Sequence, residues 1–277
     1  MTAPSGPLAE TLERLAGVGP WFGGHLGEPE GDGWHRFSDV FHDDRLAVWV
    51  DDLAAHHDGR RDVAGSYLGG WLAGAATAVP TAALVLERRL PDPAGELWFH
   101  RHEEGWFDRV AFEGTGVFAT SADPAASHPD VVVVATADLP RVFARGLVDR
   151  LTPVLDAVRG AAPFGRSGLW GGVADELASA ALGAARAAGT DTGDAWRLAE
   201  AVTDAIAEER RWLRARPRPF AVTTGRGTTA FIVRGTCCLY YKTQPQPPDA
   251  SGDSHCNTCP FRDDDSRHRR LAADAEA

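Results

Sequence analysis

The sequence is short of positive charge. Lys and Arg together number 28 of 277 residues against 39 Asp and Glu, which gives a formal net charge of -11. A surface of that charge repels a phosphate backbone, so nucleic-acid binding is not expected. Internal repeats, coiled-coil heptads and long low-complexity tracts are also lacking. Because 44% of the residues are hydrophobic, the chain is expected to be globular with a sizeable buried core.

The N-terminus lacks a secretory signal, because no basic region precedes an apolar stretch there. We therefore expect a cytoplasmic protein. Cysteine is scarce as well, with four residues in the whole chain. Cytoplasmic thiols are kept reduced, so four clustered cysteines are more readily explained as metal ligands than as two disulfides.

A transmembrane segment is not expected, although residues 63–86 carry no charge and are long enough to span a bilayer. Glycines and threonines make this stretch only weakly apolar. Pro80 is expected to divide it into a small-residue helix over 63–79 and a β-prone stretch over 81–86. The helix is predicted to be buried, with its glycines allowing close packing.

Hydrophobic periodicity predicts an α+β body, with helices around a small antiparallel or mixed sheet. The predicted helices cover residues 7–16, 38–57, 140–158, 168–188 and 194–213. The predicted strands are a hairpin of 96–102 with 106–112 and a short buried strand at 131–135. We expect the body to cover 1–218, and a C-terminal module over 219–277 to begin with a hairpin of 220–224 and 228–233.

All four cysteines fall in that C-terminal module, as Cys237 and Cys238, a spacer of seventeen residues, and then Cys256 and Cys259. A Cys-x-x-Cys pair can present both thiolates on the same side of the chain, so 256–259 is expected to form half of a metal site. Adjacent cysteines on a regular strand point to opposite faces, so both can be ligands only if the chain kinks, which Gly235 would allow. Two irons accommodate adjacent ligands more easily than one zinc, which favours an iron–sulfur cluster; zinc and free or regulatory thiols are the alternatives.

The segment Arg234-Gly-Thr-Cys-Cys-Leu-Tyr240, followed by Cys256-Asn-Thr-Cys-Pro260, resembles the C-terminal motif of the FhuF-type ferric-siderophore reductases. The resemblance implies a [2Fe-2S] cluster held by Cys237, Cys238, Cys256 and Cys259. It also implies a one-electron reduction of a ferric siderophore, commonly of the hydroxamate type, that releases Fe(II). The spacer is longer here than is usual in that family, but loop closure costs grow only slowly with length.

The electron donor is not evident from the sequence. The string Gly225-Arg-Gly-Thr-Thr-Ala230 fits a dinucleotide motif, but it lies between two predicted strands, so a β-turn is the better interpretation. A ferredoxin-like or flavoprotein partner is therefore expected to supply electrons. The arginine-rich run 210–218 could bind that partner or an anionic ferric complex through charge complementarity. The simpler interpretation of this run is a solvated helix end. The sequence leaves open a loose association with the inner membrane or with a siderophore transporter.

Two other functions stay open. The chain could be a siderophore-binding or iron-handling protein with a structural zinc site, or an iron–sulfur redox sensor. Several weaker site candidates each have an ordinary structural interpretation as well: an exposed loop for His255, cross-strand pairing for His100 and His102, and core packing for Tyr240, Tyr241 and Trp170.

Overall fold

The computed structural model describes residues 5–244 and 254–276, which form an α+β fold, as predicted. The helices are α1 (Pro7–Val18), α2 (Arg45–Ala55), α3 (Arg61–Glu87), α4 (Leu139–Ala161), α5 (Arg166–Ala188), α6 (Thr192–Glu209), α7 (Asp264–Glu276) and the 3-10 helix η1 (Tyr240–Thr243). The strands are β1 (His25–Leu26), β2 (Trp34–Arg36), β3 (Leu90–Pro91), β4 (Leu97–Arg101), β5 (Phe107–Phe112), β6 (Val117–Ala119), β7 (Val131–Val133), β8 (Arg218–Thr224) and β9 (Gly227–Val233).

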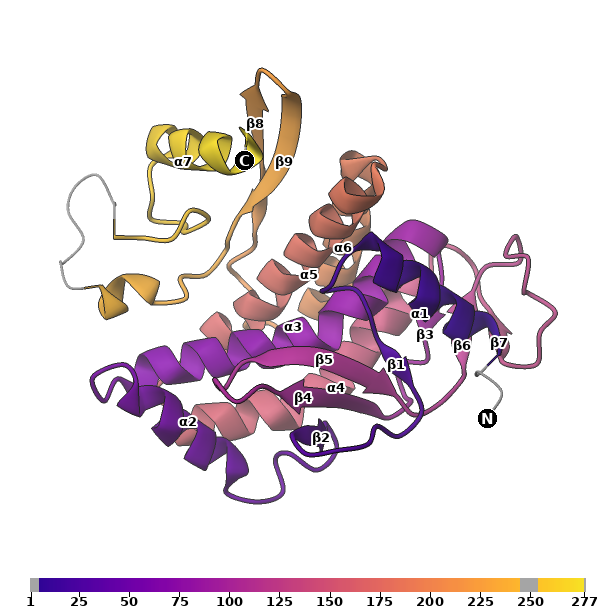
Figure 1. Ribbon diagram of the computed structural model, residues 1–277, viewed down its shortest axis with the longest axis horizontal. Helices are drawn as coiled ribbons and strands as arrows, with labels where there is room; N and C mark the ends of the chain where they lie inside the picture. Colours follow the sequence, from indigo (N-terminus) through magenta and orange to yellow (C-terminus); the bar gives the residue numbers. More distant parts are fainter. Residues whose placement is uncertain (1–4, 245–253, 277) are drawn as a thin grey trace.

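Helix α3 is the central element of the body, lying between the strands β4 and β5 on one side and α5 on the other (Figure 1). Its glycines allow the close packing that the sequence predicted. A Cβ at Gly65 would lie 2.5 Å from the Ala162 Cβ, and one at Gly69 would lie 2.5 Å from a Leu169 methyl. Among the described helices, α3 is the one long and apolar enough to cross a membrane, and 67% of its most apolar window is buried inside the protein.

The prediction that Pro80 ends the helix was wrong. Helix α3 continues through Pro80 to Glu87, so residues 81–86 are helical rather than a strand. Proline removes one main-chain hydrogen bond and strains a helix by about 3 kcal/mol. Both Pro80 and the residues after it are buried against the rest of the core, and this tertiary packing outweighs the local preference.

The strands form three small sheets, with the orders β1-β5-β4-β2, β3-β6-β7 and β8-β9. The hairpin of β4 and β5 is confirmed, with a register shift between His100 and Arg101. Strand β7 pairs in parallel with β6, but it is not buried as predicted, since Val132 and Val133 are exposed. Two predicted helices are shorter than expected: α2 begins only at Arg45, and α6 ends at Glu209.

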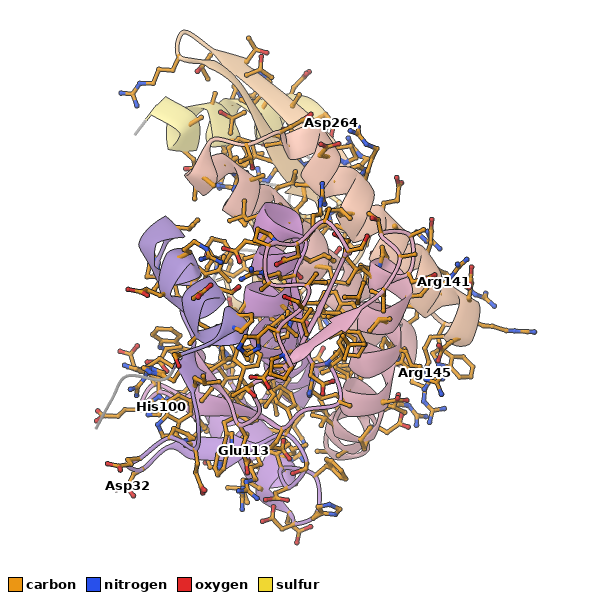
Figure 2. All side chains as sticks on the ribbon, turned by 90° about the vertical axis from the view of Figure 1, so that its right-hand side faces the viewer. Asp32, His100, Glu113, Arg141, Arg145 and Asp264 are labelled. Carbon is orange, nitrogen blue, oxygen red and sulfur yellow. The ribbon has the colours of Figure 1, made fainter. Side chains whose placement is uncertain are left out.

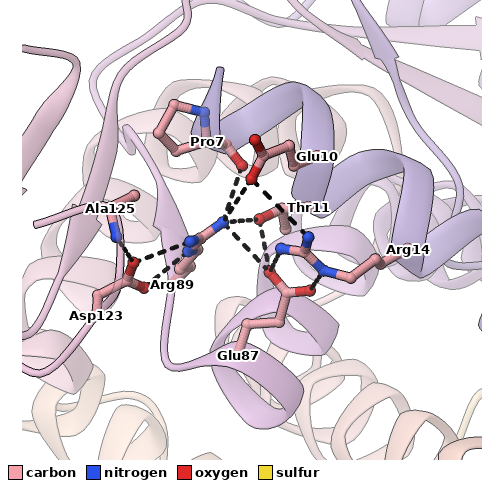
Figure 3. A network of polar contacts seen from close by, with 8 residues as sticks. All are labelled: Pro7, Glu10, Thr11, Arg14, Glu87, Arg89, Asp123 and Ala125. Carbon is pink, nitrogen blue, oxygen red and sulfur yellow. Dashed lines mark hydrogen bonds and ion pairs between the residues drawn. The ribbon is translucent and has the colours of Figure 1, made fainter. Parts of the chain in front are cut away.

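A buried ion-pair network fastens α1 to the end of α3 (Figure 3). Arg89 donates two hydrogen bonds of 2.7 and 2.9 Å to the Asp123 carboxylate and a third, of 3.2 Å, to the Thr11 hydroxyl. Thr11 in turn donates to Glu87 at 2.6 Å. Both Arg89 and Asp123 are largely withdrawn from solvent, so this network ties together three segments that are distant in sequence.

The C-terminal hairpin of β8 and β9 is confirmed and projects from the helical body together with α7 (Figure 1). The Gly225–Gly227 stretch forms its turn, in agreement with the β-turn interpretation. Ile232 of β9 packs on Ala178 and Leu182 of α5, while α7 lies against β8. Strand β8 begins at Arg218, beside the predicted module boundary; the division into two units stays a prediction.

Candidate four-cysteine metal centre

The chain leaves β9 at Val233 and reaches Cys237 through a segment that is clamped to α5. The carboxylate of Asp175, which is fully buried, accepts hydrogen bonds from the Gly235 and Thr236 main-chain N–H groups at 2.6 and 3.2 Å. It also accepts from the Thr236 hydroxyl at 2.7 Å and from the Arg234 Nε at 3.3 Å. Four donors on one buried carboxylate fix the main chain directly before the two adjacent cysteines.

Two glycines allow this segment to lie where it does. A Cβ at Gly171 of α5 would overlap the Thr236 methyl, and one at Gly235 would lie 2.5–2.7 Å from the Arg216 backbone. Glycine at position 235 therefore allows this segment to lie close to the Arg216 backbone. The left-handed residue that turns the chain comes after the cysteine pair, at Leu239, whose φ is 62°.

The second half of the site, residues 256–259, is a tight turn in which the Cys259 N–H donates to the Cys256 carbonyl at 3.1 Å. Two buried arginines hold its carbonyls. The Arg262 Nε donates to the Cys256 carbonyl at 3.2 Å, and Arg267 donates to the Cys259 carbonyl at 2.7 Å. The turn is joined to the first half by the Arg234 N–H, which donates to the Thr258 carbonyl at 2.8 Å.

These contacts bring the four predicted cysteines together. The Cys237 and Cys259 sulfurs are 3.8 Å apart, and the Cys256 thiol interacts with both Cys238 and Cys259. Cys259 is buried, the other three cysteines are partly exposed, and all four are free thiols. The Leu239 N–H points at the Cys237 sulfur, with a nitrogen-to-sulfur distance of 3.4 Å.

The thiols perturb one another's ionisation. The hydrogen bond with Cys256 and burial raise the pKa of Cys238. The contact with Cys237 raises the pKa of Cys259 to about 11, while the same contact lowers the pKa of Cys237. The opposed shifts of Cys237 and Cys259 follow from the contact between their sulfurs, because one thiol donates to the other.

One pair of sulfurs has the separation expected for two thiolates on one metal ion. Two sulfurs bound to one tetrahedral metal at roughly 2.3 Å lie about 3.8 Å apart, which is the Cys237–Cys259 separation. Within residues 5–244 and 254–276, no group of three or more His, Cys, Asp or Glu side chains is arranged to hold a metal ion. An all-cysteine donor set suits both iron–sulfur clusters and zinc.

His255 beside the second cysteine pair is buried, with 8% of its surface exposed, so the exposed-loop interpretation was wrong. Its ring lies 5.0 Å from that of Tyr241 and 6.0 Å from that of Phe261. Its Nδ1 is buried and has no hydrogen-bond partner among the described residues. A buried polar atom without a partner next to Cys256 is an additional observation in favour of a bound group at this place.

The remaining candidates lie elsewhere or are used in packing. His100 hydrogen-bonds Asp108 at 2.7 Å, and His102 stacks on Trp106, so these two histidines do not act as a pair. Figure 2 shows His100 near the opposite end of the molecule from Asp264 of the C-terminal part. Trp170 is buried as predicted, whereas Tyr240 is exposed.

The arginine-rich run 210–218 follows the end of α6 instead of forming its last turn. Three of its members make contacts within the chain. Arg210 lies over the Trp170 ring, Arg216 pairs with Asp204, and Arg218 pairs with Asp264. These contacts reduce the charge that the run could offer to a partner.

Sequence reasoning missed Asp175 and Glu176, and it named Arg234 only as the start of the cysteine motif, without a role. Both carboxylates lie in α5 amid residues that are otherwise small or apolar, such as Gly172, Val173 and Leu177. Acidic residues on the buried face of a helix are uncommon without a partner. That irregularity in the hydrophobic pattern was the available signal.

No protein-family model matches the chain, and the comparisons with curated proteins and with solved structures gave no match either.

Proposed function

We propose that the protein is a cytoplasmic ferric-siderophore reductase with a [2Fe-2S] cluster held by Cys237, Cys238, Cys256 and Cys259. The observation that carries this proposal is the convergence of two cysteine pairs, eighteen positions apart at their nearest members, with one cross-pair of sulfurs 3.8 Å apart. A pairwise arrangement of four thiols suits two iron atoms that each take two thiolates. The resemblance of the cysteine motif to FhuF-type reductases supports the same cofactor.

A cluster whose four protein ligands are all cysteine has no open position, so when bound it supplies transfer of one electron at a time. The substrate iron gains that electron and changes from Fe(III) to Fe(II). Hydroxamate oxygens are hard anionic ligands, which hold Fe(III) more strongly than Fe(II), and the reduced metal is therefore released. A reduced ferredoxin-like protein or flavoprotein is the proposed source of the electron.

The chain's own residues hold and tune the site. Asp175 fixes the segment before Cys237, and Arg262 and Arg267 fix the turn that carries Cys256 and Cys259. The Arg234 guanidinium interacts electrostatically with the Cys238 and Cys256 thiols. A positive charge in a buried place offsets part of the negative charge of four thiolates.

The first test is to purify the protein without oxygen, measure its visible and low-temperature EPR spectra after dithionite reduction, and quantify iron and zinc. About two irons per chain with a rhombic signal are expected for a [2Fe-2S] cluster. The Cys256→Ser variant should lose both the visible absorption and the release of Fe(II) from ferric hydroxamates. Retained reductase activity in a colourless variant would refute the proposal.

The second candidate is an iron-handling protein with a structural zinc site. It is favoured by the same 3.8 Å sulfur separation, because tetrahedral zinc sets that spacing as well. A colourless protein with stoichiometric zinc and no reductase activity would establish it over the first.

A further inference from the structure

A cavity of about 380 Å³ is lined by residues of α3, α5 and β5 and of the loop after α1; in Figure 1, α3 lies between α5 and β5. Its walls include the aromatic rings of Trp21, Trp71 and Phe107, and small residues of α3 such as Gly70 and Gly74 form another side. The volume falls in the range of about 300–1,000 Å³ that is typical of small-molecule sites. Mainly apolar walls with a few polar groups are also typical of such sites.

Glu176 connects this cavity to the four-cysteine site. It lines the cavity, and its Oε2 lies 3.7 Å from the place of a Cβ on Gly74. Its Oε1 is 3.4 Å from an Arg234 guanidinium nitrogen. The Arg234 main chain bonds Thr258, between Cys256 and Cys259. Glu176 and Arg234 therefore form a continuous chain of contacts from the cavity wall to the turn that carries Cys256 and Cys259.

The charged groups of the cavity restrict what it can hold. Among the described residues of its wall, Glu176 and Asp108 contribute two carboxylates, and the one basic group, Arg109, lies 3.6 Å from Asp108. Burial raises the pKa of Glu176, and its pairing with Arg234 favours the charged form. The protein as a whole carries a formal charge of -11. A multiply anionic ligand would be repelled, whereas an uncharged or cationic ligand with an apolar outer surface would not.

We propose that this cavity binds the ferric chelate and that Glu176 makes it select chelates of zero or positive net charge. This inference rests on the proposed function for the identity of the ligand. The aromatic walls contact the apolar outer surface of the chelate, and the Glu176 carboxylate faces its amide N–H or ammonium groups. Trp21, which is 61% exposed, lies at the rim with its ring 5.8 Å from that of Trp106, so the entrance is aromatic as well.

Binding can be separated from reduction by using gallium(III), which has the charge of Fe(III) and accepts no electron under these conditions. The probe is the cationic gallium complex of desferrioxamine B, titrated into the metal-loaded protein by calorimetry. The variant Gly70→Leu fills the cavity, because a Cβ at Gly70 meets no atom within 4 Å, and leucine also favours the helix over glycine. Gly160→Leu in α4 is the matched control, since its Cβ is equally unobstructed and Gly160 lies outside the cavity.

We expect the Gly70→Leu variant to bind the gallium complex at least about tenfold more weakly than the wild type, and Gly160→Leu to bind it equally well. Glu176→Gln should lower the preference for the cationic complex over the uncharged gallium complex of desferrichrome by about tenfold. The visible spectrum and thermal unfolding of each variant check that the fold and the metal centre are intact.

Equal binding by the wild type and Gly70→Leu, or no binding by a wild type that does reduce ferric hydroxamates, would overturn the inference while leaving the proposed function in place. Binding that Gly70→Leu removes, in a protein that has zinc and no reductase activity, would support the cavity and overturn the proposed function instead. Tight binding of a trianionic gallium tris-catecholate would overturn the role of Glu176.

Discussion

The clamp on Asp175 allows a quantitative prediction. The Asp175→Asn change keeps the shape of the side chain but removes its charge and one acceptor oxygen. The Oδ2 accepts from the Arg234 Nε, the Thr236 N–H and the Thr236 hydroxyl, while Oδ1 accepts from the Gly235 N–H. An asparagine can still accept at Oδ1, but its NH₂ group faces two N–H donors where Oδ2 had been.

The cost follows from those two contacts. A hydrogen bond to a charged group contributes about 1.5–3 kcal/mol, and breaking a buried ion pair from one side costs about 3–5 kcal/mol. Asp175 is fully buried and the Arg234 side chain is 20% exposed, so solvent screening is weak. We expect Asp175→Asn to lower the free energy of unfolding by about 3 kcal/mol and to reduce the metal content per chain, because the segment before Cys237 loses its anchor.

The assay is urea unfolding followed by circular dichroism, with iron and zinc quantified on the same preparations. Asp156→Asn is the control: it removes a carboxylate from an exposed pair with Arg166 on the body and should cost less than about 1 kcal/mol. If Asp175→Asn were no more destabilising than this control and kept its full metal content, the reasoning about the clamp would be refuted.

Two further predictions concern packing and pH. In Gly171→Ala, the new methyl group should overlap the Thr236 methyl, which should lower the free energy of unfolding by about 1–3 kcal/mol and lower the metal content. Adding Thr236→Ser removes the Thr236 methyl but keeps the hydroxyl, so the double variant should regain both stability and metal content in unfolding and metal assays. If the double variant regained neither, the overlap would not be the cause. Hydrogen bonding from Arg89 lowers the pKa of Asp123 in the folded protein. The ionised Asp123 carboxylate therefore stabilises the fold fully above its pKa in the unfolded chain, about 3.9, and this stabilisation is lost as pH falls through the lower pKa of the folded protein. The difference in unfolding free energy between the wild type and Asp123→Asn should therefore be constant above about pH 5 and shrink below about pH 4; a difference that grew on acidification would contradict this.

Local sequence patterns predicted the elements whose form is decided locally. The alternation in 220–224 and 228–233 gave a correct hairpin, and the cysteine spacing correctly identified residues that meet in space. The end of a helix at Pro80 was a local rule that burial of α3 overrode. The exposure of Val132 could not be read from an apolar run, because it depends on what covers the strand.

The polar contacts of the site could not be predicted for a different reason. Asp175 accepts a hydrogen bond from the Gly235 N–H, 60 positions further along the chain. No helical or strand periodicity in the sequence connects two residues so far apart. The partner of a buried carboxylate is fixed only when two elements pack, and here α5 and the end of β9 do so. A single sequence can mark such a carboxylate as unusual, but it cannot name the partner.

These contacts also explain how a long spacer between the cysteine pairs can be accommodated. The main chain of Arg234 bonds Thr258 of the second pair, and its side chain reaches Asp175 and Glu176 of α5. The carbonyls of the second pair are held by Arg262 and Arg267, which follow it in the chain. Each of these bonds lies outside the spacer of residues 239–255 or at its end. The spacing of the cysteine pairs is therefore set by α5, β9 and the segment after Cys259, so added length in the spacer costs little beyond loop entropy.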